Sequence, residues 1–166
     1  LAKAGKFEIE CAIHPDMLSA LQALEQSNQV HLHGWLSSEE STKLCRDADA
    51  LLLIEGQMTD YPFLPSKVAS YAAVGRPILA VTGARSPVAR LIANHRAGIA
   101  CVHEEQSILD GLGLLIDHPL LDREGLYSEF DEQTIMRKLD HAITSAITSW
   151  RNRTMGTDKR VPRQTA

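Results

Sequence analysis

The feature that most constrains this chain is the regular alternation of short apolar runs with segments of helical spacing, without an internal repeat. The apolar runs have the length and period of β-strands, and the other segments carry apolar residues on one helical stripe. The strand-like runs are residues 7–14, 30–34, 51–54, 77–82 and 99–105. The run at 51–54 is continuous, which predicts a central strand buried on both faces. Because strands alternate with helices, the sequence predicts an α/β fold with a doubly wound, mainly parallel sheet.

Capping and stop signals predict where several helices begin and end. Helix starts are predicted at Ser37–Ser38, where two glutamates follow in a capping-box pattern, and at Ser86–Pro87. Helix ends are predicted at Gly75 and Gly98, because glycine adopts the left-handed conformation that closes a helix. Further helices are predicted at residues 17–26, 107–118 and 131–147.

The composition is that of one globular domain from a reducing compartment. Hydrophobic residues make up 44% and charged residues 23% of the 166, which excludes fibrous, collagenous and wholly disordered classes. Cys11, Cys45 and Cys101 are far apart, so neither a disulfide framework nor a C-x-x-C metal site is indicated. No apolar stretch approaches the roughly 18 residues that span a bilayer. We expect a cytoplasmic protein, and the start without Met or a signal-peptide core leads us to expect a fragment.

The net charge of −4 is unevenly distributed along the chain. Residues 151–166 carry five basic side chains and one acidic one, a balance of +4, so residues 1–150 carry −8. An acidic body disfavours general nucleic-acid binding, and we expect no nucleic-acid partner. The basic tail lacks apolar periodicity and is expected to be disordered. It is either a solvated end or a segment that contacts the inner face of an anionic membrane, peripherally, as part of the parent protein.

Ligands of doubly wound sheets bind beyond the carboxyl ends of the strands, which directs attention to residues 33–37, 55–66 and 82–86. The common phosphate-binding patterns are absent from this sequence. No G-x-x-x-x-G-K-[ST] occurs, and Gly111 and Gly113 lie inside a predicted helix without a third glycine. A P-loop or a dinucleotide-binding fingerprint is therefore not expected.

Pro65–Ser66–Lys67, at the start of a predicted helix, is the strongest candidate for an anion site in these loops. A helix start offers unpaired amides and the positive end of the helix dipole. Ser66 and Lys67 add a hydroxyl and an ammonium group, so the segment suits a diphosphate. The alternative is that Ser66 is only a cap and Lys67 only a solvated residue of the first turn.

The segment FLPSKVASYAAVGRPILAV, residues 63–81, resembles the nucleotide-binding segment of GT-B glycosyltransferases, whose usual form is P-S-K-x-x-E-Y-x-A-x-G-K-P-V. Other elements resemble the family in the same order along the chain. They are residues 30–34, residues 46–49, Gly98, residues 117–119 and Phe130. The resemblance covers roughly residues 1–145 and is to the retaining, family 4-like members of the group.

The resemblance implies two Rossmann-like domains facing each other across a cleft, with this chain as the C-terminal, donor-nucleotide-binding one. Residues 1–145 form that domain, and residues 146–166 form the end of the C-terminal helix and the basic tail. The family's first strand and helix are expected to precede Leu1, and that strand would lie between the strands at 7–14 and 50–54. The fragment is expected to close this gap by direct pairing or to self-associate. The implied partner is an N-terminal acceptor-binding domain of the parent protein.

The site that the resemblance implies holds a nucleotide-sugar without a metal ion or a further cofactor. Cationic side chains and a helix start stabilise the departing diphosphate in this family. Two glutamates spaced E-x7-E contact the sugar and the ribose in retaining members, and their positions are Pro62 and Ser70 here. We expect Ser70 to contact the ribose and Glu55 or Asp60 to face the sugar. The expected binding residues are His33, Gly34, Trp35, Glu55, Leu64, Pro65, Ser66, Lys67 and Ser70, and no catalytic residue is assigned.

The residues after the second strand-like run are the expected nucleoside contacts. Gly34 admits close approach of a ligand to the backbone. Trp35 either stacks near the base or packs beneath the loop. His31 and His33 share one strand face, but no Cys or carboxylate cluster completes a coordination set, so no metal is expected.

The sequence thus predicts a hexosyltransferase-type glycosyltransferase domain that acts in polysaccharide or glycoconjugate biosynthesis and is inactive on its own. Because both family glutamates are missing, a catalytically degenerate nucleotide- or partner-binding module is the alternative. A UDP-sugar 2-epimerase is a third option, although those enzymes resemble this chain less around the P-S-K segment.

Overall fold

Three parallel strands form the central sheet. The computed structural model describes residues 9–12, 30–58, 62–117 and 123–155. Within these ranges β3 (Leu51–Ile54), β4 (Ile78–Val81) and β5 (Gly98–Cys101) lie side by side in that order, and both neighbouring pairs run parallel.

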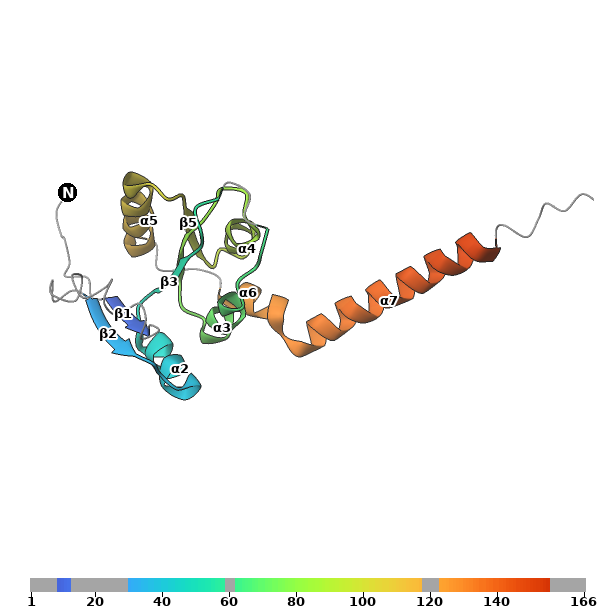
Figure 1. Cartoon of the computed structure of the whole chain (residues 1–166), viewed down its shortest axis with the longest axis horizontal. Coiled ribbons are helices and arrows are strands. Elements are labelled where there is room, and N and C mark those ends of the chain that lie inside the picture. The colour runs from blue at the N-terminus through green and yellow to red at the C-terminus, as the bar shows by residue number, and fades with distance from the viewer. Residues whose placement is uncertain (1–8, 13–29, 59–61, 118–122, 156–166) are drawn as a thin grey trace, which may run out of the picture.

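Helices cover both faces of this sheet. Figure 1 shows α5 (Glu105–Asp117) on one side and α3 (Lys67–Val74), α4 (Pro87–His95) and α6 (Arg123–Phe130) on the other. The prediction of an α/β fold with a doubly wound parallel sheet is confirmed. Helix α6 is an addition, because the sequence signals did not predict it.

Side chains that alternate along β4 fill two hydrophobic layers. Ile78 and Ala80 belong to the layer beneath α3, α4 and α6, whereas Leu79 and Val81 belong to the layer beneath α5. All four side chains are at most 5% exposed. The helices contribute Val68, Ala72, Val88, Ile92 and Leu126 to the first layer and Ile108, Leu112 and Leu115 to the second.

β3 is an edge strand, and the prediction that it is buried on both faces is wrong. Leu51 and Leu53 are buried in the first layer, but Leu52 is 39% and Ile54 66% exposed. The physical reason is that the residues of α5 in the second layer pack on β4 and β5, and nothing in the described chain covers that face of β3. A continuous apolar run therefore does not separate a buried strand from an edge strand with one bare face.

β1 (Ile9–Ala12) and β2 (Val30–Gly34) form a separate parallel pair, so the expected single sheet is wrong in this respect. No ladder joins β1 to β3 among the described residues, and the gap is not closed by direct pairing. The amides of Leu51 and Glu55 bond toward β4, so Leu52 presents its backbone to the opposite edge. There its carbonyl oxygen accepts from the Tyr71 hydroxyl at 3.2 Å.

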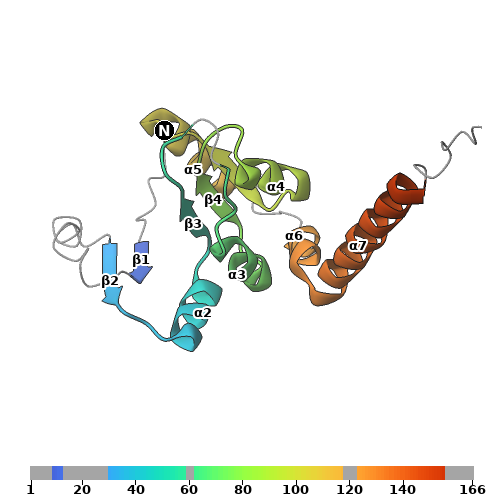
Figure 2. The ribbon, with the colours of Figure 1, turned by 45° about the vertical axis from the view of Figure 1, so that its right-hand side comes forward.

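The end of β2 lies beside the start of α2 (Ser38–Asp47) and away from the loops that follow β3, β4 and β5 (Figures 1 and 2). The loops at 33–37, 55–66 and 82–86 therefore do not meet at one edge of a common sheet. The helix predicted at 17–26 lies outside the described residues.

Three predicted helix boundaries are confirmed by their hydrogen bonds. At the start of α2, the Ser37 amide donates to Glu40 Oε2 at 2.8 Å and the Glu40 amide donates to Ser37 Oγ at 3.2 Å, which completes the capping box. Hydrogen bonding to Ser37, by its side chain and then its backbone, lowers the pKa of Glu40. Gly75 ends α3 at φ 71°, and Ser86 caps α4 with Pro87 in its first turn.

Gly98 does not end α4, which is a second correction. Arg96 takes the left-handed conformation there, at φ 47°, and Gly98 is the first residue of β5. The glycine is required by close packing instead, because a Cβ atom at this position would lie 1.8 Å from the Ile78 carbonyl oxygen. Absence of a side chain lets β5 approach β4.

The longest helix is α7 (Glu132–Met155), which projects away from the sheet (Figures 1 and 2). Asp131 caps it by accepting from the amides of Gln133 and Thr134. Glu129 of α6 ties its first turns to the body, since it pairs with Lys138 of α7 and, at 3.5 Å, with His95 of α4. The helix extends to Met155, five residues into the segment that the sequence predicts to be disordered.

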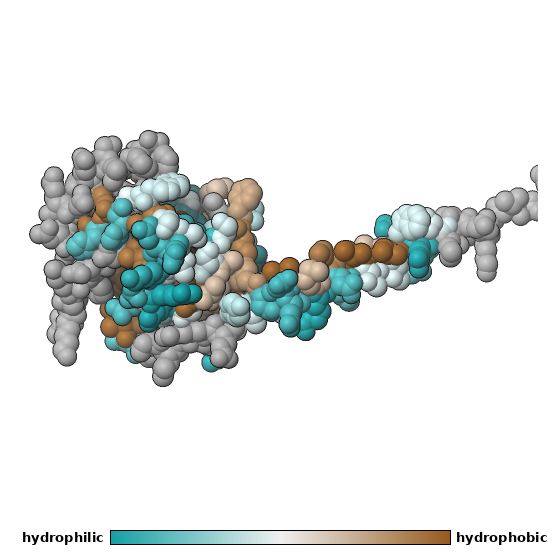
Figure 3. Space-filling model, turned by 90° about the horizontal axis from the view of Figure 1, so that it is seen from below, coloured by the Kyte–Doolittle hydropathy of each residue, from teal (hydrophilic) through white to brown (hydrophobic). Residues whose placement is uncertain are grey.

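One face of α7 is apolar and uncovered. Figure 3 shows a brown stripe along the projecting helix. The stripe consists of six side chains, each 46–61% exposed, at helical spacing: Ile135, Met136, Leu139, Ile143, Ile147 and Trp150. None of the described helices is both long enough and apolar enough to cross a bilayer.

We predict that Gly98→Ala destabilises the fold by about 3 kcal/mol, because the new methyl group must push β5 from β4. The matched control is Gly113→Ala in α5, where no atom lies within 4 Å of the added Cβ. That change is expected to stabilise the helix by up to about 1 kcal/mol. Urea unfolding followed by circular dichroism measures both, and equal midpoints for Gly98→Ala and the parent sequence would contradict the packing argument.

Candidate functional site

Polar residues follow the three strands of the central sheet at its carboxyl edge. Glu55 comes directly after β3 and Thr82 directly after β4, and His103 follows β5 by two residues. Backbone hydrogen bonds hold them in register: the Glu55 amide donates to Val81 at 3.0 Å and the Thr82 amide to Cys101 at 2.9 Å. His103 Nε2 lies 2.8 Å from the Glu55 carbonyl oxygen, and because a carbonyl only accepts, this nitrogen carries the proton.

The side chains of Glu55, Thr82 and Ser86 form a buried chain of hydrogen bonds, which we name the Glu55 relay. The three residues are 6%, 1% and 0% exposed. Thr82 Oγ1 bonds to Glu55 Oε2 and lies 2.7 Å from Ser86 Oγ. Ser86 Oγ accepts from the Ala89 amide at 3.0 Å, in the first turn of α4.

The direction of the hydrogens in the Glu55 relay follows from the number available. A hydroxyl has one hydrogen, so when Thr82 donates to the carboxylate, the Thr82–Ser86 bond must use the hydrogen of Ser86. Each member then donates toward Glu55, which is the terminal acceptor. The other carboxylate oxygen, Oε1, is buried and has no hydrogen-bond partner in the part of the chain that is described. A buried, unpaired acceptor of this kind costs about 1–3 kcal/mol.

The start of α3 is not capped by a side chain. Ser66 is in the right-handed helical conformation and its hydroxyl bonds no backbone amide of the helix start. The first turn is closed by backbone bonds alone, from Val68 to Pro65 and from Ala69 to Ser66. The alternative in which Ser66 serves only as a cap is therefore wrong. Ser66 and Lys67 are both exposed, as are Leu64 and Ser70, and Pro65 is half-buried.

Lys67 lies close enough to α2 to affect Cys45. Burial raises the pKa of the Cys45 thiol, and the Lys67 ammonium lowers it by a smaller amount. Lys67 forms no ion pair with any residue that the structure describes. Its charge is thus available to a ligand near the first turn of α3.

The structure does not bring His33, Gly34 and Trp35 to the same edge as Glu55. They lie where β2 ends, beside the start of α2 (Figure 2). Gly34 has φ 67° and open space around it, so its conformation, more than any close contact, calls for glycine. Trp35 is 76% exposed, which excludes packing beneath the loop.

His31 and His33 both lie on the exposed face of β2. Among the described residues no three His, Cys, Asp or Glu side chains are arranged to hold a metal ion. Cys45 and Cys101 carry free thiols.

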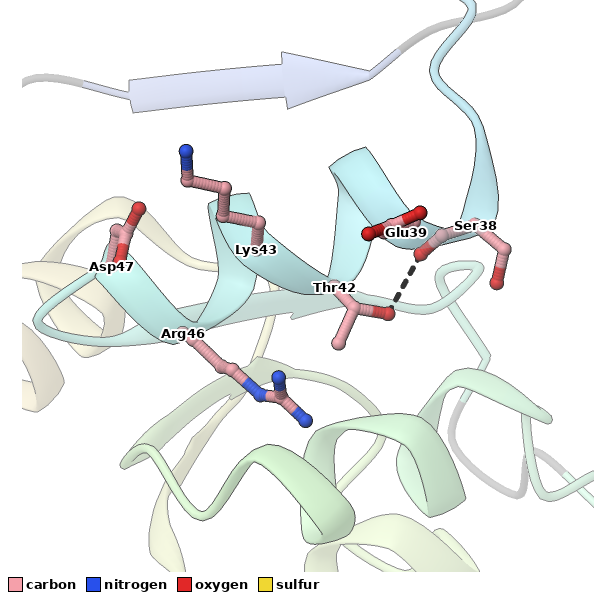
Figure 4. A pocket seen from close by; sticks show the side chains of 6 residues that line it. All are labelled: Ser38, Glu39, Thr42, Lys43, Arg46 and Asp47. Atoms are coloured by element: carbon pink, nitrogen blue, oxygen red, sulfur yellow. Dashed lines mark hydrogen bonds between the residues drawn. The ribbon is translucent and has the colours of Figure 1, made fainter.

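A shallow hollow of about 550 Å³ lies along α2, away from the expected site residues. It is lined by Ser38, Glu39, Thr42, Lys43, Arg46 and Asp47. Figure 4 shows Lys43 and Arg46 pointing to opposite sides of the helix, so their charges do not converge on one ligand atom. The Arg46 carbonyl oxygen is occupied by the Arg76 guanidinium at 2.7 and 3.0 Å. We assign the hollow no function.

Sequence reasoning missed the partners of Glu55. The sequence patterns place Thr82 only within the 82–86 loop and Ser86 only at a helix start, and they give His103 no role. The signal that identifies Thr82 and His103 is position: polar residues at or just past the end of an apolar strand meet at the carboxyl edge of a parallel sheet.

No protein-family model and no curated protein matches this sequence. Among solved structures the chain is similar to AviGT4, a glycosyltransferase involved in avilamycin A biosynthesis. The TM-score is 0.53 at 13% identity, over 90% of this chain and 43% of that chain. The chain therefore has a glycosyltransferase-like fold, and it spans less than half the length of the glycosyltransferase that it resembles.

Two serines at helix starts allow a matched test of the local structure. We predict that Ser86→Ala lowers the free energy of unfolding by about 1–2 kcal/mol, because it removes the cap of α4 and a member of the Glu55 relay. Ser66→Ala is expected to change it by less than about 0.5 kcal/mol, since Ser66 caps nothing. Thermal and urea unfolding measure both changes; an equal loss for Ser66→Ala would show that Ser66 is a cap after all.

Proposed function

We propose that this chain is the donor-binding domain of a retaining GT-B glycosyltransferase of the family 4-like group. It would serve the transfer of a hexose from a nucleotide-sugar to a hydroxyl acceptor in polysaccharide or glycoconjugate biosynthesis. The observation that carries the proposal is the P-S-K segment at the start of α3, where an exposed hydroxyl and an exposed ammonium flank a helix start without a side-chain cap. The glycosyltransferase-like fold supports it.

The proposed diphosphate site needs no metal ion. The amides of the first turn of α3, the Ser66 hydroxyl and Lys67 supply hydrogen bonds and positive charge. When the bond from sugar to diphosphate breaks, negative charge grows on the leaving oxygens. Groups already held in place around those oxygens lower the barrier, because they do not have to reorient during the reaction.

The proposed sugar subsite lies at the other end of the 55–66 loop. In this proposal Glu55 replaces the sugar-facing glutamate, whose position is Pro62. Glu55 suits that role because its carboxylate is held by the Glu55 relay and retains one unpaired oxygen. Ser70, exposed on α3, is the proposed ribose contact, and Leu64 and Pro65 border the diphosphate.

The proposed nucleoside contacts at His33, Gly34 and Trp35 require a different placement of the β1–β2 pair. These residues lie away from the carboxyl edge of β3, β4 and β5. The proposal requires the β1–β2 pair to take a position beside the free edge of β3, which differs from the arrangement described above. The exposed side chains of Leu52 and Ile54 and the unladdered edge of β3 are compatible with such a neighbour.

We further propose that the partner of this chain is an N-terminal acceptor-binding domain of the same protein. The chain spans 43% of the similar glycosyltransferase, so a second domain of comparable size accounts for the remainder. The apolar stripe on α7 is the surface proposed to contact it, because a projecting helix with six exposed apolar side chains is stabilised when a second surface covers them. Cytoplasmic location with peripheral membrane contact stays a prediction from the sequence.

A catalytically degenerate binding module is the second candidate. The observation that favours it is the absence of both family glutamates, since Pro62 and Ser70 stand in their places. The two candidates differ in turnover: the enzyme hydrolyses or transfers the donor sugar in the full-length protein, whereas the module binds the nucleotide with equal affinity and releases it unchanged.

Lys67→Ala in the full-length protein is expected to weaken the binding of a nucleoside diphosphate about tenfold, because one charge-assisted contact is lost. A panel of UDP, GDP, ADP and TDP in isothermal titration calorimetry measures the affinity. Lys43→Ala is the matched control, an exposed lysine on α2, and its affinity is expected to stay within about twofold of the parent. Unchanged affinity for Lys67→Ala would remove Lys67 from the site.

Ile143→Lys on α7 is expected to loosen the contact with the proposed second domain. A charge in the centre of the stripe opposes its burial, whereas Ser145→Lys places the same charge on the far side of the helix. Limited proteolysis of the full-length protein measures the release of α7, with faster cleavage expected for Ile143→Lys only. Equal cleavage of the two variants would show that the stripe contacts no second domain.

A further inference from the structure

The Glu55 relay is more than a structural cap for α4. Capping requires only Ser86, which already accepts from the Ala89 amide. The relay continues from Ser86 through Thr82 to a carboxylate, and it leaves Oε1 of that carboxylate buried and unpaired in the described chain. Buried polar atoms are almost always satisfied, so an unpaired carboxylate oxygen at the carboxyl edge of a parallel sheet calls for a donor from outside the fold.

The missing donor has a defined chemistry. Oε1 only accepts, so it bonds to a group that carries hydrogen. Metal coordination is not indicated, since the described residues contain no set of ligands around Glu55. Sugar hydroxyls are donors of the required kind, and a carboxylate binds them by charge-assisted hydrogen bonds that are stronger than neutral ones.

We propose that Glu55 Oε1 accepts a hydrogen bond from a hydroxyl of the bound sugar, and that Thr82 and Ser86 are positioning residues that hold the carboxylate for it. This inference rests on the proposed function. Thr82 fixes Oε2, which leaves Oε1 as the oxygen that faces the ligand. Residues 56–58, which directly follow Glu55, are exposed.

The Glu55 relay also explains why the carboxylate is anchored from α4. The Ala89 amide belongs to the first turn of α4, at the positive end of the helix dipole. Through Ser86 and Thr82 this end of the helix points its hydrogens at Glu55. Loss of the Thr82 hydroxyl breaks the connection, so the carboxylate loses its orientation even though Thr82 itself does not contact the sugar.

The test measures binding of nucleotide-sugars and of free nucleoside diphosphates to the full-length protein and four variants by calorimetry. The probes are UDP-glucose, GDP-mannose, ADP-glucose and TDP-glucose, each beside its own diphosphate. Glu55→Gln is expected to weaken the nucleotide-sugar about 10- to 100-fold and the diphosphate less than about twofold, because only the sugar contact is lost.

Thr82→Val keeps the shape of the side chain and removes the hydroxyl. It is expected to weaken the binding of the nucleotide-sugar at least tenfold and to leave the binding of the diphosphate unchanged. Thr82→Ser restores the hydroxyl and is expected to restore affinity to within about threefold of the parent. The double variant Glu55→Gln/Thr82→Val is expected to be no weaker than Glu55→Gln, since a positioning residue has no effect once its target is changed.

Three outcomes would overturn the inference. If folded Glu55→Gln binds the nucleotide-sugar as tightly as the parent protein does, Glu55 is not part of the sugar subsite. If the losses of nucleotide-sugar affinity add up in the double variant, Thr82 is not a positioning residue. Equal weakening of nucleotide-sugar and diphosphate in Thr82→Val shows a merely structural role. Failure of the proposed function is distinguishable from these, because the unaltered protein would then bind none of the eight probes.

Discussion

The two-sided burial of β4 is the constraint on which the rest of the described structure depends. Its four side chains alternate between the layer beneath α3, α4 and α6 and the layer beneath α5, and each is almost completely buried. A strand in that position must have close neighbours on both edges. On one edge the neighbour is β5, whose backbone at Gly98 lies so close to Ile78 of β4 that no side chain fits there. The other edge is occupied by β3, which is buried only on the side that faces the three helices.

The same strand places the polar cluster at the carboxyl edge. Thr82 is the residue after β4, so its backbone is fixed by the bond to Cys101 and its hydroxyl falls between Glu55 and Ser86. A polar network that extends from a rigid strand is positioned more accurately than one carried by a loop. Glu55 is buried and held by the hydroxyl of Thr82, whereas Ser66 and Lys67 are exposed at the start of a short helix.

Sequence patterns correctly predicted those structural features that depend on a few adjacent residues. The capping box at Ser37 and Glu40, the left-handed end at Gly75 and the Ser86–Pro87 start each depend on a few adjacent residues, and all three are present. The order of strands and helices, and with it the α/β class, follows from periodicity for the same reason. Element bounds within the described chain differ from the expected ones by only a few residues, except at the end of α7, which extends to Met155 and so past the expected end at residue 147.

Features decided by contacts across the fold were not predictable in this way. Whether Leu52 and Ile54 are covered depends on the reach of α5, which the LLLI run does not encode. The sequence pattern explains Gly98 as a helix end, and only the distance to Ile78 shows that close packing of β5 on β4 requires this glycine. The partners of Glu55 lie 27 and more residues away, and their meeting depends on the pairing of β3 with β4. A position just past a strand end is the one local sign that Thr82 and His103 share.

Helix α7 has the geometry of a lever. Its 24 residues give a rigid rod about 36 Å long, held at one end by Asp131 and by the pairing of Glu129 with Lys138 and His95. A rotation of about 10° at that end displaces the far end by about 6 Å. Since α6 packs Leu126 into the layer shared by β3, β4 and α4, α7 is connected through α6 to the helix whose first turn bonds to the Glu55 relay.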